Sequence, residues 1–224
     1  MQHGDTWAPV MSRVRRRWPT TTVEFDTPTL EAGLDAIAGA GRGGVVVGYS
    51  MGGRLALRAV LREPRVYRAL VLVGATPGIE DEQRRRSRRA ADDELADWME
   101  CASIHAIVDH WENQPVFATQ SLDVVERQRR GRLSHQPARL AAMLRATGQG
   151  VLPPVWNQLG RLVLPVLAVA GERDDRYAQI AQRMAREVPI GQAALVPGAG
   201  HAAHLEQPDE FSDLLLDFLD EHFG

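Results

Sequence analysis

The sequence lacks several features, and each absence excludes a class of protein. Among its 224 residues Cys101 is the single cysteine, which excludes a disulfide framework and a zinc site built from cysteines. The longest apolar run, Leu162–Gly171, holds ten residues, whereas a membrane-spanning helix needs roughly 20. No basic segment followed by an apolar one opens the chain, so we expect no secretory signal and a cytoplasmic protein.

Lysine is absent too, and all 26 basic residues are arginine. They are outnumbered by 29 acidic residues, and the net charge of -3 predicts no nucleic-acid partner. The apolar fraction of 44% excludes a disordered chain, and the length suits one domain that carries an insertion. Most arginines are explained by genomic base composition, but some can bind carboxylates through their planar donors. Composition does not distinguish the two kinds of arginine, so their positions in the sequence must.

Strand and helix patterns alternate at both ends of the chain. The β-branched run Val45–Val47 between glycines predicts a strand buried on both faces, and Thr29 is the expected N-cap of the helix that precedes it. Such alternation predicts a parallel sheet covered by helices on both faces. The expected strands are 22–26, 45–47, 69–73, 163–169 and 193–196, and the expected helices are 29–40, 51–63, 175–187 and 208–223.

The middle of the chain has a different character, because it contains no long β-branched run. Amphipathic spacing there predicts helices at about 81–100, 103–112, 121–131 and 136–146. We therefore expect an α/β core made of residues 1–79 and 159–224, with a helical cap inserted at 80–158.

The most specific motif is Gly48–Gly53, with the sequence Gly-Tyr-Ser-Met-Gly-Gly. It fits G-x-S-x-G between a predicted strand and a predicted helix, the pattern of a nucleophile elbow around Ser50. The sharp turn strains the serine, and we expect side chains at the flanking glycine positions to clash. The helix that follows offers the backbone N–H of Met51 to a developing oxyanion.

A serine hydroxyl needs a histidine to activate it, and His201 lies in a glycine-rich loop after the last predicted strand. His204 is the rival, although a local hydrogen bond that stabilises the loop explains it better. The orienting acid is expected between serine and histidine in chain order. The loop after the fourth strand offers Glu172, Asp174 and Asp175; we choose Asp174 and assign Asp175 to the N-cap of the next helix.

At these residues the sequence resembles the α/β-hydrolase fold superfamily. It resembles more closely the family of menaquinone-pathway synthases that form 2-succinyl-6-hydroxy-2,4-cyclohexadiene-1-carboxylate. The resemblance runs from about residue 43 to the C-terminus, and its most discriminating parts are the arginine after the elbow and the tryptophan run in the cap. The matching segments are Gly48–Arg54, Trp111–Phe117, Gly171–Asp174, Gly198–His204 and Glu206–Pro208.

The resemblance implies a lyase rather than a hydrolase. In that family, serine made basic by histidine removes a proton beside the succinyl ketone, pyruvate is eliminated, and no metal or organic cofactor is used. The substrate carries three carboxylates, and Arg54, one helical turn after Ser50, points back toward the elbow. By the resemblance, the residues that contact substrate are Tyr49, Arg54, Arg88, Trp111 and Arg132.

The N-terminal region departs from the family pattern. The family has additional strands and a His-Gly-Phe turn before the first helix, and that turn donates the second oxyanion N–H. Here His3-Gly4 is followed by no phenylalanine, and Trp7 matches the tryptophan that opens the helix. We therefore expect the N-terminal strands to be missing, either because the start codon is assigned too late or because the protein is a reduced homologue.

Three functions follow from these patterns. The first is the pyruvate-eliminating lyase, the second a serine hydrolase of small esters or carbon–carbon bonds, and the third a non-catalytic protein that binds polycarboxylates. For the favoured lyase we expect a small polycarboxylate as substrate, no bound metal, and a monomer or small homo-oligomer.

Overall fold

The computed structural model describes residues 3–24 and 27–224. Their strands form one parallel sheet in the order β1-β2-β3-β4. The predicted α/β fold with a parallel sheet is therefore confirmed. The strands are β1 (Val45–Tyr49), β2 (Ala69–Val73), β3 (Val166–Gly171) and β4 (Gly191–Val196).

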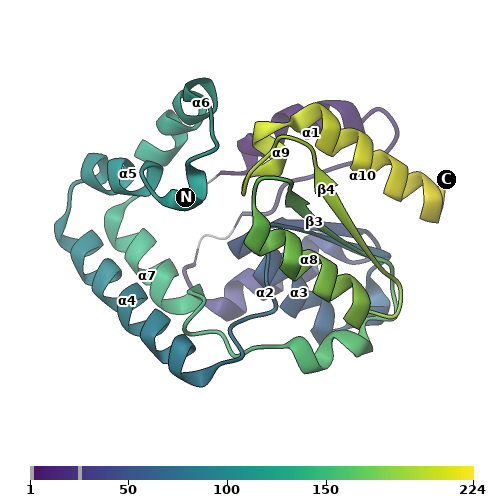
Figure 1. Cartoon of the computed structure of the whole chain (residues 1–224), viewed down its shortest axis with the longest axis horizontal. Coiled ribbons are helices and arrows are strands. Elements are labelled where there is room, and N and C mark those ends of the chain that lie inside the picture. Colours follow the sequence, from purple (N-terminus) through teal and green to yellow (C-terminus); the bar gives the residue numbers. More distant parts are fainter. Residues whose placement is uncertain (1–2, 25–26) are drawn as a thin grey trace.

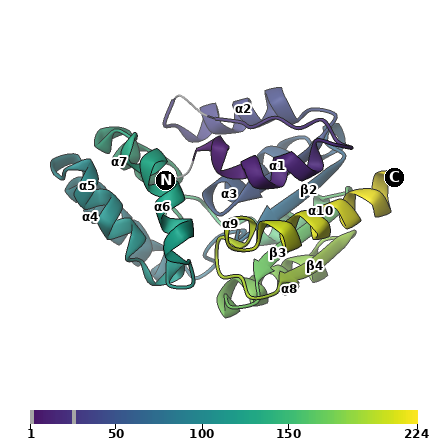
Figure 2. The same ribbon diagram turned by 90° about the horizontal axis from the view of Figure 1, so that it is seen from above.

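Helices cover both faces of this sheet, and the two faces have separate apolar cores (Figures 1 and 2). On one face Leu57 and Met184, from α3 (Met51–Arg62) and α8 (Asp175–Glu187), pack with Leu70 of β2. On the other face α1 (Ala8–Val14) and α10 (Pro208–Phe223) pack against β2 and β3, and Phe211 of α10 is fully buried there. Parallel strands need this cover, because their apolar side chains point to both faces.

Helix α2 (Leu30–Gly41) packs on α3 through Leu34 and Ile37. Its first turn has the expected cap, because the side chain of Thr29 accepts a hydrogen bond from the backbone N–H of Ala32. The helix predicted at 29–40 is therefore confirmed together with its N-cap.

The four helices predicted in the middle of the chain are also present: α4 (Glu82–Cys101), α5 (Ile104–Glu112), α6 (Leu122–Leu133) and α7 (Pro137–Thr147). They lie beside the sheet and its covering helices, and α4 and α7 run next to each other (Figure 1). Short 3-10 turns at Gly4–Trp7, Pro64–Val66, Pro115–Phe117 and Trp156–Arg161 and the helix α9 (Ala203–Glu206) complete the described elements.

Three expectations for strands are wrong in detail. Residues 22–24 form no strand, and Glu24 instead accepts a hydrogen bond from the backbone N–H of Gly4; Phe25 and Asp26 lie outside the described residues. Residues 45–47 are half-buried rather than buried, because β1 is an edge strand that pairs with β2 alone in the described part of the chain. Strand β3 begins at Val166 rather than at 163, after Pro165, which has no N–H to donate.

Candidate active site

Ser50 lies in the sharp turn between β1 and α3, as the elbow motif predicts. It is the only described non-glycine residue with a positive φ, at 47°. Its backbone N–H bonds the carbonyl of Val73 at the end of β2, and its own carbonyl accepts the N–H of Arg54. The sheet and the first turn of α3 together impose this strained backbone, which lifts the hydroxyl above the end of the strands.

The glycines around Ser50 have different roles. A Cβ at Gly48 would lie 2.7 Å from the Cα of Gly53, and a Cβ at Gly53 would lie 2.6 Å from the Cβ of Ala75. A Cβ at Gly52, however, would meet no atom within 4 Å. The expected clash at the second glycine of the motif is therefore wrong, and Gly48 and Gly53 are the glycines that let α3 approach β1.

The structure brings together the three residues predicted as a triad. The Nε2 atom of His201 lies 3.2 Å from the Oγ of Ser50, and its Nδ1 atom lies 2.8 Å from the Oδ2 of Asp174. Both distances are within hydrogen-bond reach, and they place the imidazole between the hydroxyl and the carboxylate. This arrangement can move a proton from the serine to the histidine while the carboxylate holds one orientation of the ring.

Glutamates that the sequence reasoning did not select hold the His201 loop in place. The carboxylate of Glu206 accepts the backbone N–H groups of Gly200 and Ala202, at 2.8 and 3.0 Å, on either side of the histidine. Glu172, the other glutamate near the site, accepts the N–H of Gly198. A signal for Glu206 was its position five residues after the histidine, within reach of the same turn.

The cap of helix α8 is the second function of Asp174. Its Oδ1 atom accepts the backbone N–H of Tyr177 at 3.2 Å, while Oδ2 faces His201. The expectation that Asp175 caps this helix is therefore wrong, because Asp175 is its first residue. The cap fixes the carboxylate that the histidine needs.

A cavity of about 1120 Å³ opens at the triad and reaches both the middle helices and the edge of β1. Ser50, Asp174 and His201 line it, together with Tyr49, Arg54, Arg88 and Trp111 among the residues predicted to contact substrate. Apolar side chains of the core, among them Val10, Val14, Val45 and Leu219, also line it. The cavity therefore combines the triad and two arginines with apolar lining.

Arg54 is a buried cation without a carboxylate partner in the described part of the chain. One guanidinium nitrogen donates to the carbonyl of Thr147 at 3.0 Å, and Nε has no partner. Burial lowers the pKa of Arg54 to about 10, so the side chain still carries its charge at neutral pH. A buried charge of this kind is stabilised when an anion binds it.

Tyr49 and Trp111 line the same cavity. The hydroxyl of Tyr49 is buried without a hydrogen-bond partner, and burial raises the pKa of Tyr49 well above its usual value. Its ring lies 5.4 Å from that of His201, and the ring of Trp111 lies 5.8 Å from that of Phe117. The tyrosine hydroxyl is therefore neutral at physiological pH.

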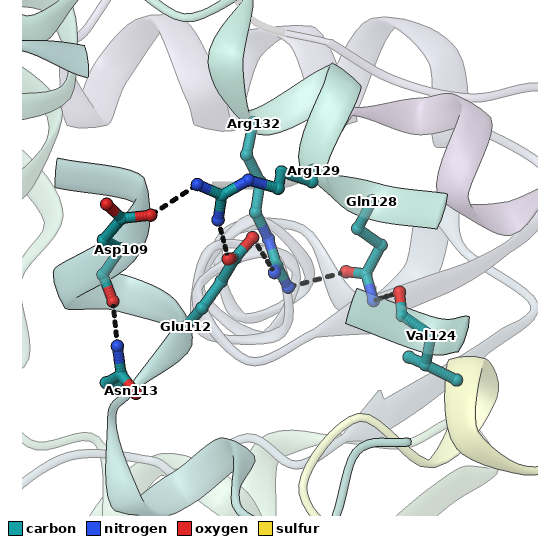
Figure 3. A network of polar contacts seen from close by, with 7 residues as sticks. All are labelled: Asp109, Glu112, Asn113, Val124, Gln128, Arg129 and Arg132. Carbon is teal, nitrogen blue, oxygen red and sulfur yellow. Dashed lines mark hydrogen bonds and ion pairs between the residues drawn. The ribbon is translucent and has the colours of Figure 1, made fainter. Parts of the chain in front are cut away.

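Arg132 is the predicted substrate contact that lies outside this cavity. It lines a smaller cavity of about 230 Å³ between α6 and the N-terminal turn. Its guanidinium bonds Glu112 and Gln128, each at 3.0 Å, and stands 6.0 Å from the ring of Phe117. Figure 3 shows why it is held there: Glu112 supplies the counter-charge that a buried arginine needs.

The same network ties α5 to α6. Arg129 contacts both Glu112 and Asp109, and Gln128 donates to the carbonyl of Val124 at 3.0 Å (Figure 3). Glu112 is adjacent in sequence to Trp111, and Phe117 lies 6.3 Å from the ring of His201. Arg132 thus reaches the triad region through Phe117 rather than by direct contact with the cavity.

His204 is packed rather than hydrogen-bonded, so the loop-stabilising hydrogen bond expected for it is wrong. It is fully buried, and neither ring nitrogen has a partner. Its ring stacks on Trp7 at 4.2 Å and lies 4.6 Å from the ring of Tyr49. Burial, with His201 nearby, lowers its pKa to about 3, so it is neutral at physiological pH.

The N-terminal turn contacts the middle helices. The ring of His3 bonds the carbonyl of Gly131 and the hydroxyl of Ser134 in and after α6, and the N–H of Gly4 bonds Glu24.

Within residues 3–24 and 27–224, no group of three or more His, Cys, Asp or Glu side chains is placed to hold a metal ion. No helix of those residues is long and apolar enough to cross a bilayer.

Comparison with known proteins places this site in a family. The sequence profile described as "Alpha/beta hydrolase family" matches residues 3–214. A Bacillus subtilis (strain 168) protein named "Putative 2-succinyl-6-hydroxy-2,4-cyclohexadiene-1-carboxylate synthase" is 34% identical over 222 residues, which cover 97% of this chain and 77% of that protein. The synthase of that name from Escherichia coli O1:K1 / APEC is 32% identical over 163 residues, 73% of this chain and 63% of its own.

A solved structure agrees with these relatives. The structure of MenH from S. aureus superposes with a TM-score of 0.87 at 28% identity, and the match covers 100% of this chain and 91% of that one. The chain belongs to the alpha/beta hydrolase family, and within it is similar to the 2-succinyl-6-hydroxy-2,4-cyclohexadiene-1-carboxylate synthases.

Proposed function

We propose that this protein is a carbon–oxygen lyase that eliminates pyruvate from 2-succinyl-5-enolpyruvyl-6-hydroxy-3-cyclohexene-1-carboxylate. The observation that carries the proposal is the combination, in one cavity, of a serine–histidine–aspartate triad with a buried arginine that has no carboxylate partner among the described residues. The similarity to synthases named for the product of this reaction supports it. In this role the enzyme works in menaquinone biosynthesis, and we place it in the cytoplasm.

The reaction needs a base beside the succinyl ketone. His201 accepts the proton of Ser50, and the serine oxygen removes the ring proton next to that ketone. The electron pair left at C2 forms a C2=C3 double bond, the existing C3=C4 double bond shifts to C4=C5, and the C5–O bond to the enolpyruvyl group breaks. The proton taken up by the serine–histidine pair returns to the departing enolpyruvate, which becomes pyruvate. Asp174 stabilises the imidazolium, and no acyl-enzyme, metal or organic cofactor takes part in these steps.

Three carboxylates must leave water when this substrate binds. We assign Arg54 and Arg88 to them, because both line the cavity that contains Ser50. Tyr49 and Trp111 line the same cavity, and we assign both to the substrate pocket. The backbone N–H of Met51, at the start of α3, is assigned to the developing oxyanion.

Residues 80–158 act as a cap over the core formed by residues 1–79 and 159–224. The support is that Arg88 and Trp111 from this segment line one cavity with Ser50 and His201 from the core. Arg132 then acts indirectly: it holds Glu112, and through Phe117 it fixes the wall of the cap that faces His201. We propose that the protein acts on a small polycarboxylate, with no nucleic-acid partner, as a monomer or small homo-oligomer.

The test is pyruvate release from the enolpyruvyl substrate, followed with a coupled lactate dehydrogenase assay. We expect release by the wild-type chain and its loss in Ser50→Ala, with both proteins folded by circular dichroism. A folded wild-type chain that releases no pyruvate would overturn the proposal.

A serine hydrolase is the second candidate, favoured by the 3.2 Å approach of Ser50 to His201 in a strained elbow. It predicts covalent labelling of Ser50 by a fluorophosphonate and turnover of small esters. Ester turnover without pyruvate release would favour the hydrolase, whereas pyruvate release that is far faster than ester turnover favours the lyase.

A further inference from the structure

Asp92 is a buried carboxylate in the cap that the mechanism above does not use. It lies on α4, is 3% exposed, and lines the cavity that contains Ser50. Buried carboxylates are rare without a partner, so its contacts identify what it does.

The main partner is Arg88, one helical turn earlier on α4. The Nε of Arg88 donates to the Oδ1 of Asp92 at 2.7 Å, and the arginine side chain remains 41% exposed where the aspartate side chain is only 4% exposed. A bond through Nε leaves both terminal nitrogens of the guanidinium free to receive a planar anion. The carboxylate of Asp92 therefore fixes the guanidinium through Nε and leaves its two terminal nitrogens accessible to a ligand.

The other oxygen of Asp92 faces the loop after α7. The N–H of Gly150 lies 3.5 Å from Oδ2, and a Cβ at Gly148 would come within 2.7 Å of the same atom. The neighbouring residue Thr147 accepts the bond from Arg54 through its carbonyl. Asp92 thus contacts Arg88 through one oxygen and approaches the chain after α7 through the other. The last residue of α7, Thr147, contacts Arg54.

The charges fit one bound carboxylate. Burial is the main cause of the lowered pKa of Arg54; the positive charge of Arg88 lowers this pKa further, and the negative charge of Asp92 raises it. Two arginines and one aspartate leave a net charge of one, which a single carboxylate of a ligand neutralises.

We propose that Asp92 is a positioning residue for substrate binding, which holds Arg88 beside Arg54 so that the pair grips one carboxylate of the substrate. The inference rests on the proposed function and deepens it, because it names a residue that acts through Arg88 rather than on the reacting atoms.

The test compares Asp92→Asn, which keeps the shape and removes the charge, with Asp93→Asn. Asp93 is the next residue on α4, and its contact with Arg89 at 3.8 Å lies on the surface. We expect Asp92→Asn to raise KM for the enolpyruvyl substrate about tenfold, the scale of one charge-assisted hydrogen bond, with kcat within about twofold. Asp93→Asn should match the wild type in both constants.

A second arm separates positioning from a merely structural role. In an Arg88→Ala background, Asp92→Asn should have no further effect on KM, because the residue that it positions is gone. A tenfold rise in KM caused by Asp92→Asn in the Arg88→Ala background would overturn the inference. An effect of Asp92→Asn on kcat alone would overturn it too. Asp92→Glu gives the same test if Asp92→Asn does not fold, because it keeps the charge but moves the carboxylate away from its position 2.7 Å from the Nε of Arg88.

Binding of succinate, measured by calorimetry, keeps this inference separate from the proposed reaction because it needs no turnover. Weaker succinate binding in Asp92→Asn but not in Asp93→Asn supports the inference, even if the protein releases no pyruvate. The absence of pyruvate release would then overturn only the proposed reaction. Pyruvate release with equal KM in the two variants would overturn only the role of Asp92. A wild type that neither binds succinate nor releases pyruvate would overturn both.

Discussion

His204 should make the stability of this protein depend on pH, and the structure gives the size of the effect. The ring is fully buried between Trp7 and Tyr49, and neither nitrogen has a hydrogen-bond partner. Protonation would place an unpaired charge in that position, so burial lowers the pKa from 6.5 to about 3.

The direction follows from the two pKa values. Above pH 6.5 the histidine is neutral in both the folded and unfolded chains, and its contribution does not change with pH. As the pH falls from 6.5 toward 3, His204 becomes protonated in the unfolded chain but stays neutral in the folded chain, so the free energy of unfolding decreases. At about 1.4 kcal/mol per pH unit, the loss between pH 7.5 and pH 5 is about 2 kcal/mol.

The assay is urea unfolding of wild type and His204→Phe at pH 7.5 and pH 5. Phenylalanine keeps an aromatic ring in the stack and cannot titrate. The drop in the free energy of unfolding between pH 7.5 and pH 5 should therefore be about 2 kcal/mol smaller in the variant than in the wild type. Other groups, such as His135 with its lowered pKa, titrate alike in both proteins and cancel. His105→Phe, at an exposed position, should keep the wild-type pH dependence; a His204→Phe variant that also keeps it would refute the reasoning.

Three further predictions follow from the same contacts. Arg54→Ala should raise KM for the enolpyruvyl substrate by about 10- to 100-fold, since a charge-assisted hydrogen bond contributes about 1.5–3 kcal/mol; steady-state kinetics that show an unchanged KM would remove Arg54 from the site. Phe211→Ala should lower the unfolding free energy by about 3–5 kcal/mol, because the ring is fully buried under β2 and β3; a urea midpoint near that of the wild type would contradict this packing. Gly53→Ala should lower the melting temperature, because its methyl group would meet Ala75, whereas Gly52→Ala should change stability by no more than about 1 kcal/mol since it points into open space; equal melting temperatures for the two variants would contradict the close approach of α3 to β1.

The sequence predicted the elements that local patterns define. The strand at 69–73 and the helices that begin at Leu30, Asp175 and Pro208 have boundaries set by caps, prolines and apolar spacing, and these need no knowledge of the rest of the fold. The loop histidine and the acid before α8 could also be chosen, because the ends of parallel strands meet at one rim of the sheet.

Features that depend on distant neighbours could not be predicted in this way. Whether the run Val45–Val47 is buried depends on strand order, and it is an edge in the described sheet. Arg132 could not be placed from its match to the family, because its partner Glu112 lies 20 residues earlier on another helix. Similarly, the alternation at 22–24 indicates a strand, but Glu24 instead accepts a hydrogen bond from Gly4, which lies 20 residues earlier in the chain.

The central claim is that the hydroxyl of Ser50 and the imidazole of His201 act as one base, and a double-mutant comparison tests it most directly. We predict that kcat/KM for pyruvate release falls by at least about 1000-fold in Ser50→Ala and in His201→Ala, and that the double variant is no slower than the slower single variant, as for residues that act as a unit. Losses that multiply in the double variant, or a single variant that keeps most of its activity, would contradict the claim.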